Sequence, residues 1–347
     1  MTMLRKYYLK EFLKAFIIVA LGFSVMLASV DLIDKLEEFE VKSATLLLRY
    51  TLLVLPKYLV FTMPMASLFA ALFLAGQSMR TKEAVAVMGA GGRLRSLFLP
   101  VALTGALLSL ASFGISESIA PAGMREARTI SEGQRASLFR KGTIWLRAED
   151  GSIVRFFVYS KETGRAKGIT IFRFEQGRLS ERIEADEANY TDEGWLLKKV
   201  TRYKFDEAKI DREEALSVAN FVSSAILEKE VLAPEEMGMK DLYEYSGRLE
   251  KAGIRNIKVA VDMHSRFSYP FVNFFMVLLG LALALRSGMG GLASASLGVA
   301  VSLLYWFGYT MGLSLGYAGI FPPPLAAWIV PLIFAALSVG LFITIKE

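Results

Sequence analysis

The sequence contains no cysteine and only one histidine, His264. A chain without cysteine can form no disulfide, has no thiol nucleophile and offers no thiolate ligand to a structural zinc ion. A lone histidine with no paired carboxylate nearby is typical of a structural residue, and a ligand or catalytic base is the alternative for His264. There is also no GxxxxGK[ST] loop, so the chain is not expected to cradle a nucleotide phosphate itself. We therefore predict no catalytic residue, no metal site and no cofactor in this chain.

Ionisable residues are also missing from the middle of six long apolar runs, in a chain whose composition is 54% hydrophobic. Each run is close to the about 20 residues that cross a hydrocarbon core as a helix, which predicts a polytopic membrane protein. Carriers that use an ion gradient usually need ionisable groups within the membrane. Any energy for transport is therefore expected to enter at the cytoplasmic surface. The runs cover residues 12–31, 58–79, 97–116, 267–285, 292–314 and 325–345.

The runs are split three and three by a polar insertion, residues 117–266. From residue 142 to residue 205 it shows short alternating or aromatic segments broken by turn dipeptides such as Asp150-Gly151 and Gln176-Gly177, which predicts strands. Residues 117–138 and 234–266 are expected to be helical connectors. The predicted fold is a membrane α-helical bundle of six transmembrane helices (3 + 3) with an inserted periplasmic all-β jellyroll-like domain. Its predicted parts are residues 1–116, 117–266 and 267–347.

Lysine and arginine in the short loops predict the orientation, because cytoplasmic loops carry an excess of both residues. They all fall on one side, so both termini are predicted to be cytoplasmic and the inserted domain periplasmic. The first run lacks a small-x-small cleavage site and is expected to be a retained helix. The net charge of +6 is explained by this bias, and no nucleic acid is expected as a partner. The cations are Arg5, Lys6, Lys10, Lys14, Arg80, Lys82, Arg93, Arg95, Arg286 and Lys346.

One cytoplasmic loop, residues 78–96, has the pattern of a partner contact. Residues 83–88 are predicted to form a short helix within about residues 80–92, and the glycines that follow are expected to end it. An apolar face on this helix would need a partner groove to cover it. The alternative is an interfacial helix buried among lipid headgroups. The face comprises Ala84, Val85, Val87 and Met88, and the glycines are Gly89, Gly91 and Gly92.

Several segments resemble the LptF/LptG family of lipopolysaccharide-export permeases, and the likeness spans essentially the whole chain. The segments are TKEAVAVMGAGG (81–92), IAPAGMREAR (119–128), VDMHSRFSYPFVNFF (261–275) and GIFPPPLAAWIVP (319–331). Each motif is degenerate, but their order and spacing are specific. FPPPLAAWIVP, LAPEEMGMKDLYEY and the Asp34-Lys35-Leu36 exit of the first helix look closer to LptG than to LptF.

The resemblance implies a permease subunit of an ATP-driven ABC transporter in the inner membrane of a Gram-negative bacterium. Such a permease extracts lipopolysaccharide from the outer leaflet of that membrane and passes it to a periplasmic jellyroll bridge toward the outer membrane. The implied partners are a paralogous LptF-type permease, an LptB-type cytoplasmic ATPase dimer that binds ATP and Mg²⁺, LptC/LptA-type periplasmic jellyroll proteins, lipopolysaccharide and membrane lipid. The alternatives are the LptF-type paralogue, or a mechanotransmission or scaffold protein that does not move lipid.

The resemblance also implies roles for named residues. The loop around Glu83, Val87, Met88 and Gly91 matches the family's coupling helix, which docks into the ATPase. Candidate contacts for the lipid A phosphates are Lys35, Lys42, Arg125 and Arg128, with ordinary solvated charges as the alternative.

The sequence departs from the LptG pattern at Asp31, where LptG-type chains tend to present a basic residue toward the lipid. Either Lys35 substitutes, or a divalent cation bridges, or the partner subunit supplies the charge.

Overall fold

The structure is a computed structural model that describes residues 2–37, 39, 43–137, 144–148, 151–160, 165–175, 178–191, 194–205, 209–218, 236–251, 256–287 and 291–345. The chain divides into two compact units. The helical unit comprises residues 1–36, 43–124 and 257–347, and the second unit comprises residues 37–42 and 125–256. Each unit is described by itself below.

Among the described residues, six helical stretches are long and apolar enough to cross a membrane. Most of these helical stretches are longer than the apolar runs, since the helices continue past the residues predicted to cross the hydrocarbon core. One stretch combines α4, a π-helical turn η1 and the start of α5. The elements are α1 (Thr2–Lys35), α2 (Ala44–Arg80), α4 (Leu94–Gly114), η1 (Ile115–Ile119), α5 (Ala120–Ser137), α8 (Ile257–Ser287), α9 (Gly291–Tyr317) and α10 (Pro323–Ile343).

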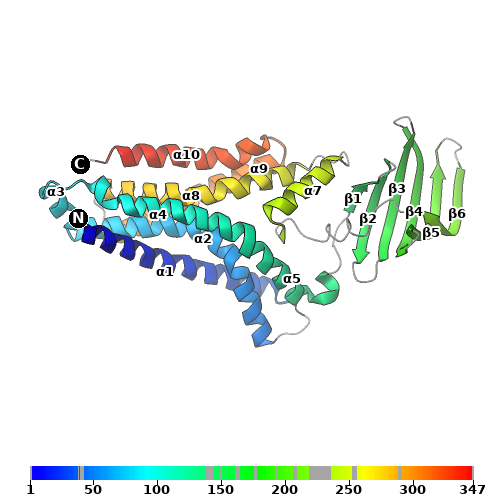
Figure 1. Cartoon of the computed structure of the whole chain (residues 1–347), viewed down its shortest axis with the longest axis horizontal. Helices are drawn as coiled ribbons and strands as arrows, with labels where there is room; N and C mark the ends of the chain where they lie inside the picture. Colours follow the sequence, from blue (N-terminus) through cyan, green and yellow to red (C-terminus); the bar gives the residue numbers. More distant parts are fainter. Residues whose placement is uncertain are drawn as a thin grey trace. The chain divides into compact units, whose positions relative to one another are not determined.

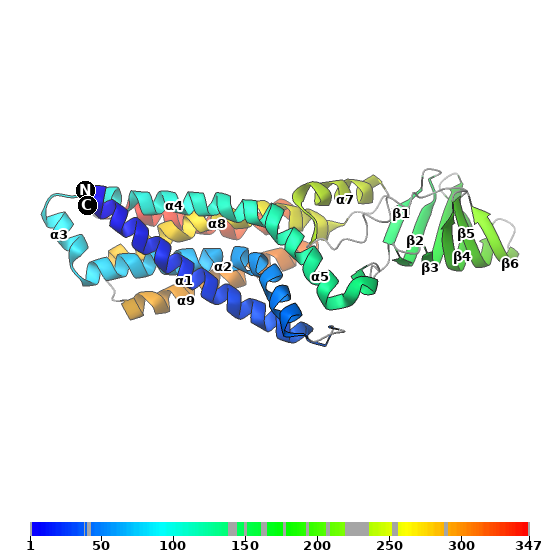
Figure 2. The same ribbon diagram turned by 60° about the horizontal axis from the view of Figure 1, so that its bottom comes forward.

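Helices α2 and α8 form the centre of the helical unit, since their apolar spans are largely buried whereas those of α1, α9 and α10 are mostly exposed. Figures 1 and 2 show the long helices side by side, with both termini at the end that also carries the short helix α3 (Glu83–Gly89). Helix α2 contains Pro56 and Pro64 and is bent in Figure 1. Proline lacks an amide proton for the helical hydrogen bond and therefore kinks a helix.

Small residues allow the central helices to approach closely, as is common between membrane helices. A Cβ atom placed on Gly280 of α8 would lie 2.8 Å from the Cβ of Ala71 and 2.8 Å from the carbonyl oxygen of Leu68, both in α2. These distances are far shorter than a normal contact. The contact between α2 and α8 therefore depends on glycine at residue 280.

We expect Gly280→Ala to destabilise the helical unit by about 1–3 kcal/mol, the usual cost of overpacking a well-packed core. The measurement is the thermal unfolding midpoint of the purified full chain. Gly340→Ala in α10 is the matched control, because a Cβ at Gly340 meets no atom within 4 Å. Equal midpoints for the two variants would contradict this account of the α2–α8 contact.

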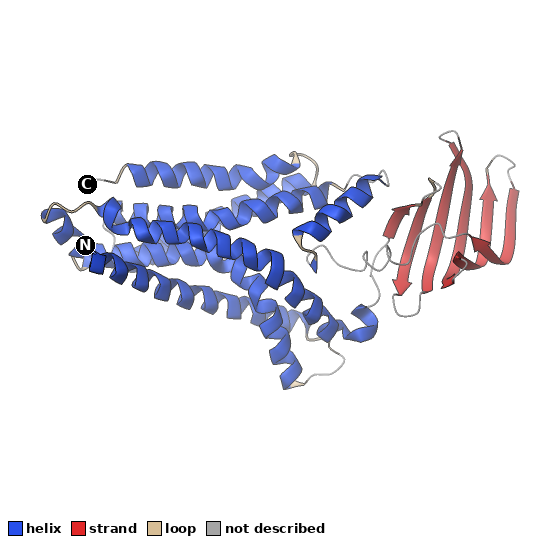
Figure 3. Cartoon of the chain, viewed as in Figure 1, coloured by secondary structure: helices blue, strands red, loops and turns tan. Residues whose placement is uncertain are grey.

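The second unit contains one antiparallel sheet of six strands in the order β1-β2-β3-β4-β5-β6, so each strand pairs with its neighbours in the chain. Figure 3 shows all the described strands gathered in this sheet. One face carries a core in which Phe156, Ile171, Trp195 and Leu197 are buried. The strands are β1 (Ile144–Arg147), β2 (Ile153–Ser160), β3 (Arg165–Glu175), β4 (Arg178–Thr191), β5 (Gly194–Lys204) and β6 (Lys209–Val218). A helix, α7 (Met239–Lys251), follows in the same unit.

The expected fold class, a six-helix membrane bundle with an inserted β domain, is confirmed. Among the described strands the order is a simple meander, without the crossing connection of a jelly roll. Strand β6 lies outside the segments predicted as strands. The two units meet in the chain at residues 36/37, 42/43, 124/125 and 256/257. The boundaries at 116/117 and 266/267, which follow the ends of the apolar runs, stay a prediction about the membrane-spanning parts.

Candidate functional site

The predicted short cytoplasmic helix is present as α3, Glu83–Gly89. Its last turn ends as predicted in a glycine cap: the amide of Gly92 donates to the carbonyl of Val87 at 2.8 Å, and that of Gly91 to Met88 at 2.9 Å. Gly91 has φ = +76°, the left-handed conformation that glycine adopts at little cost. At the other end Lys82 has φ = +62°, so the chain turns sharply out of α2 into α3.

The apolar face of α3 is mostly covered by the chain itself, in contrast to the expectation that it needs a partner groove. Ala84 is fully buried, and Val87 and Met88 pack against the core of the helical unit. Val85, which the sequence grouped with them, is 45% exposed and is not among the residues that pack against this core. A short loop that folds back under a bundle can use the bundle as its own groove, and helical spacing alone does not reveal this. Val85 is therefore the large apolar side chain of α3 that stays exposed and is available to a partner.

Glu83 also makes a contact within the chain. The hydroxyl of Tyr8 donates a hydrogen bond of 2.8 Å to its carboxylate. The side chain is therefore anchored to α1 while the exposed residues of α3 face outward. Of the four residues predicted to form the ATPase contact, Glu83, Val87 and Met88 are partly buried and Gly91 is exposed.

A cavity of about 560 Å³ lies within the helical unit, lined by residues of α1, α2, η1, α8 and α9. Its wall is mainly apolar and aromatic, and it includes the cations Lys57 of α2 and Arg266 of α8. Each cation directly precedes an apolar run, 58–79 or 267–285. The lining comprises Leu27, Lys57, Tyr58, Val60, Phe61, Ser116, Ser265, Arg266, Tyr269, Pro270, Trp306, Tyr309, Thr310 and Leu313.

Aromatic contacts hold the wall of this cavity in place. The hydroxyl of Tyr269 donates to the carbonyl of Phe61 at 2.6 Å, and the two rings stack with centroids 6.3 Å apart. Tyr269 also contacts the ring of Tyr309 of α9. Arg266 faces Glu117 of the π-helical turn at 4.0 Å, and Lys57 lies 5.6 Å from the ring centroid of Tyr58. An apolar pocket with a few fixed cations suits an anionic amphiphile, whose acyl chains need apolar surface and whose phosphates need positive charge.

Of the predicted headgroup contacts, Lys35 lies in the helical unit, at the end of α1. Its Nζ atom lies 5.8 Å from the ring centroid of Tyr50. The hydroxyl of Tyr50, a fully buried residue, donates a 2.6 Å hydrogen bond to Asp31. The carboxylate of Asp31 thus joins α1 to α2 within the chain. Lys42 lies outside the described residues.

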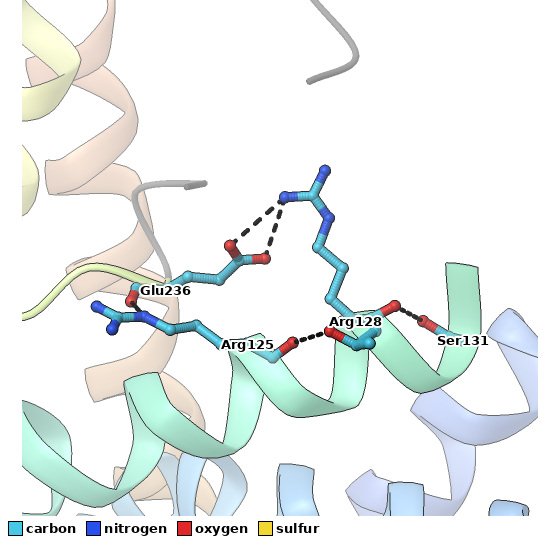
Figure 4. Close-up of polar contacts among 5 residues, drawn as sticks. Arg125, Arg128, Ser131 and Glu236 are labelled. Atoms are coloured by element: carbon cyan, nitrogen blue, oxygen red, sulfur yellow. Dashed lines mark hydrogen bonds and ion pairs between the residues drawn. The ribbon is translucent and has the colours of Figure 1, made fainter. Parts of the chain in front are cut away.

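Arg125 and Arg128 of α5 lie in the second unit and share one partner, Glu236, as Figure 4 shows. The Nε atom of Arg125 donates to the backbone carbonyl of Glu236 at 2.7 Å, and its Nη2 atom pairs with Asp241 at 2.9 Å. The guanidinium of Arg128 pairs with the Glu236 carboxylate at 3.3 Å, where the Glu236 side chain is only 6% exposed. Both arginines therefore hold α5 against the segment that leads into α7.

We expect Arg128→Ala to loosen this contact by about 1–3 kcal/mol, because a buried carboxylate loses a charged partner. Faster hydrogen exchange at α5 and at the first turn of α7, in the absence of any lipid, is the expected observation. The matched control is Lys167→Ala, which removes an exposed ion pair with Glu187 in the same unit. If exchange changed only when lipid was present, Arg128 would act in headgroup binding and not in holding these helices.

Sequence reasoning missed Tyr8, Lys57 and Arg266. A signal was present for two of them, since Lys57 and Arg266 each stand at the start of an apolar run on the predicted periplasmic side. Tyr8 gave no signal, because its partner Glu83 is 75 residues away in the chain. Within the described residues, no group of three histidine, cysteine, aspartate or glutamate side chains is placed to hold a metal ion.

Comparison with known proteins gives one family match. The model of the family described as "Lipopolysaccharide export system permease LptF/LptG" matches residues 6–344, nearly the whole chain. This description covers both paralogues and does not separate LptG from LptF. None of the curated proteins matches the chain.

Proposed function

We propose, from the premise that this chain belongs to the LptF/LptG family, that it holds part of the exported lipid in its own helical cavity and is driven by a separate ATPase. Membership makes the chain a permease subunit of lipopolysaccharide export, a multi-pass protein of the inner membrane and a transport protein rather than a catalytic one. The source of energy, the partners and the lipid contacts are the proposed part.

The cavity lined by Lys57 and Arg266 is the observation that carries the lipid-binding part of the proposal. Its aromatic and aliphatic wall suits acyl chains, and the two cations suit phosphates of the headgroup. A volume of about 560 Å³ is that of a site for a drug-sized ligand, much smaller than a whole lipopolysaccharide molecule. This chain therefore holds a part of the lipid, and a paralogous permease completes the enclosure around the rest.

The proposal for energy input rests on α3 and on what the apolar runs lack. The runs have no ionisable residue in their middle, which argues against coupling to an ion gradient. Helix α3 lies at the same end of the helical unit as both termini (Figure 2), the end predicted to be cytoplasmic. A cytoplasmic ATPase dimer that binds ATP and Mg²⁺ docks on α3, so that its closure moves the helices around the cavity. The bound nucleotide belongs to that partner, and this chain itself binds no cofactor.

The sheet is the proposed route for onward transfer. In the predicted orientation it lies in the periplasm. Edge strands such as β1 offer backbone groups to which a strand of an LptC/LptA-type jellyroll protein can add. The lipid then passes from the membrane helices to a periplasmic jellyroll bridge.

The test is reconstitution of the chain with its paralogue and the cytoplasmic ATPase in membrane nanodiscs containing lipopolysaccharide. The expected result is ATP-dependent loss of lipid from the nanodisc to a soluble jellyroll acceptor, together with lipid that co-purifies with the complex. Hydrolysis without any lipid transfer would indicate a mechanotransmission permease. A complex with neither associated ATPase nor bound lipid would contradict the proposal as a whole.

A further inference from the structure

The first turns of α1 contact three other helices at the end of the unit that carries α3. Tyr8 is the centre of these contacts and is only 1% exposed. Its hydroxyl donates to the carboxylate of Glu83 in α3 at 2.8 Å and lies 3.1 Å from the hydroxyl of Ser78 in α2. Its ring packs on Phe98 of α4, with centroids 5.0 Å apart. A single buried side chain thus joins α1 to α2, α3 and α4.

Helix α3 has only 7 residues and cannot maintain its position by its own hydrogen bonds. Its apolar contacts with the helical unit come from Ala84, which is fully buried, and from Val87 and Met88, which are partly buried. The hydrogen bond from Tyr8 to Glu83 also connects α3 to α1. An uncharged hydroxyl that donates to a carboxylate makes a charge-assisted bond, which is stronger than a neutral one.

From Tyr8, a continuous buried stripe runs along α1 at every fourth residue. Residues spaced by four lie next to one another along the surface of a helix, and α1 packs mainly against α2. Two further hydrogen bonds fix the same pair of helices: Ser24 with Thr62 at 2.9 Å, and Tyr50 with Asp31 at 2.6 Å. Helix α1 is therefore bound along one side from its first turns to its last. The stripe comprises Tyr8, Phe12, Phe16, Ala20, Ser24 and Ala28, each at most 6% exposed.

Helix α1 also contributes Leu27 to the wall of the cavity. Leu27 precedes Ala28, the last residue of the buried stripe. A displacement of α3 that is passed to Tyr8 therefore reaches the cavity wall through one helix, without a flexible joint between them.

We propose that Tyr8 is a positioning residue that makes α1 follow α3, so that movement of the coupling helix changes the wall of the lipid cavity. This inference rests on the proposed function, since it requires an ATPase that acts on α3. Tyr8 touches neither the lipid nor the ATPase. It acts through the hydrogen bond to Glu83, which transmits displacement between two helices that are far apart in the chain.

The test compares Tyr8→Phe with Tyr7→Phe in the reconstituted complex with its ATPase. The first variant removes one hydroxyl from a buried ring, and the second removes one from the adjacent tyrosine, which is 50% exposed. The quantity measured is lipopolysaccharide released per ATP hydrolysed, normalised to the ATPase bound. We expect an about tenfold fall for Tyr8→Phe, the size expected for loss of a bond to a charged group, and no change for Tyr7→Phe.

Two variants of Glu83 test the bond from its other side. Glu83→Gln keeps an oxygen that accepts from Tyr8 and should retain most of the lipid released per ATP. Glu83→Ala lacks the acceptor and should match Tyr8→Phe. The double variant Tyr8→Phe/Glu83→Ala should be no worse than either single variant, because both remove the same bond.

A spectroscopic measurement follows the movement directly. Because the chain has no cysteine, spin labels can be placed specifically at Ile18→Cys in α1 and Leu332→Cys in α10, residues that are 71% and 57% exposed. The distance between them should change when ATP binds to the complex, and the change should be reduced in the Tyr8→Phe background.

Equal release per ATP in wild type and Tyr8→Phe, or an equal change in label distance, would overturn the role of Tyr8 and leave the proposed function standing. Failure of the wild-type complex to couple hydrolysis to release would instead count against the proposed function. A fall of the same size in Tyr7→Phe would show that any loss of hydroxyl near the start of α1 has this effect, which also contradicts a specific role for Tyr8.

Discussion

Replacing Val85 with aspartate should abolish co-purification of the cytoplasmic ATPase and, with it, ATP-driven release of lipid. Val85 is 45% exposed and does not belong to the core of the helical unit, unlike Ala84, Val87 and Met88. If this side chain fills a groove of the ATPase, a carboxylate would be buried there without a partner, at a cost of several kcal/mol. A loss of this size at a central interface residue weakens binding by about 30-fold or more. The measurement is the amount of ATPase recovered with the affinity-purified permease.

The control variant is Val85→Leu, which keeps an apolar side chain at the same position and should retain the ATPase. Helix α3 itself should remain folded in both variants, because its buried contacts come from Ala84, Val87 and Met88. Undiminished ATPase recovery with Val85→Asp, together with normal hydrolysis, would mean that α3 does not dock there. If the aspartate weakened only the association of the loop with lipid, the interfacial-helix alternative would be supported.

A charge reversal at Glu83, one of the four residues that the resemblance implies for the ATPase contact, is a less specific test of docking. Because Glu83 accepts a hydrogen bond from Tyr8, an arginine there would disturb α1 and α3 even if no ATPase were present. Val85 avoids this ambiguity. Glu83 and Val85 are two residues apart, yet one contacts α1 and the other is exposed, so the direction of a side chain has to be known before a loop residue is assigned to a partner.

The membrane helices could be predicted from the sequence because each one must satisfy its backbone hydrogen bonds internally and must be apolar over the bilayer. Both requirements are local, so the composition of a single segment is sufficient. The end of α3 could also be predicted from local sequence, because Gly91 adopts a left-handed conformation that favours glycine. Strand β6 shows the limit of this reasoning. Its residues are largely polar, and its place in the sheet comes from backbone pairing with β5.

The partners of charged and polar side chains could not be predicted, since they are set by contacts between distant segments. Arg128 pairs with Glu236, which is 108 residues away, and the sequence around the arginine does not indicate this partner. Asp31 looked like a lost lipid contact, yet it accepts a hydrogen bond from Tyr50. In each case the sequence shows the charged residue, but the packing of distant segments decides which partner its side chain contacts.

The second large effect is expected at the cavity. Lys57→Ala should weaken lipid capture by about tenfold, since a partly desolvated, charge-assisted contact with phosphate is worth roughly 1.5–3 kcal/mol. The measurement is the amount of lipopolysaccharide that co-purifies with the complex. Lys258→Ala is the matched control, because Lys258 lies in the same helical unit, likewise rests against a tyrosine ring, that of Tyr317, and is not among the residues that line the cavity.

The chemistry of the contact can be separated from its position by using lipid whose phosphates have been removed. If Lys57 binds phosphate, the substitution should have little effect on capture of dephosphorylated lipid, and wild-type protein should capture that lipid about as weakly as Lys57→Ala captures the natural one. An equal loss with both lipids would mean that Lys57 supports the shape of the cavity beside Pro56. No loss with either would place the headgroup elsewhere, and Arg266 would then be the next cation of the wall to replace, together with its partner Glu117.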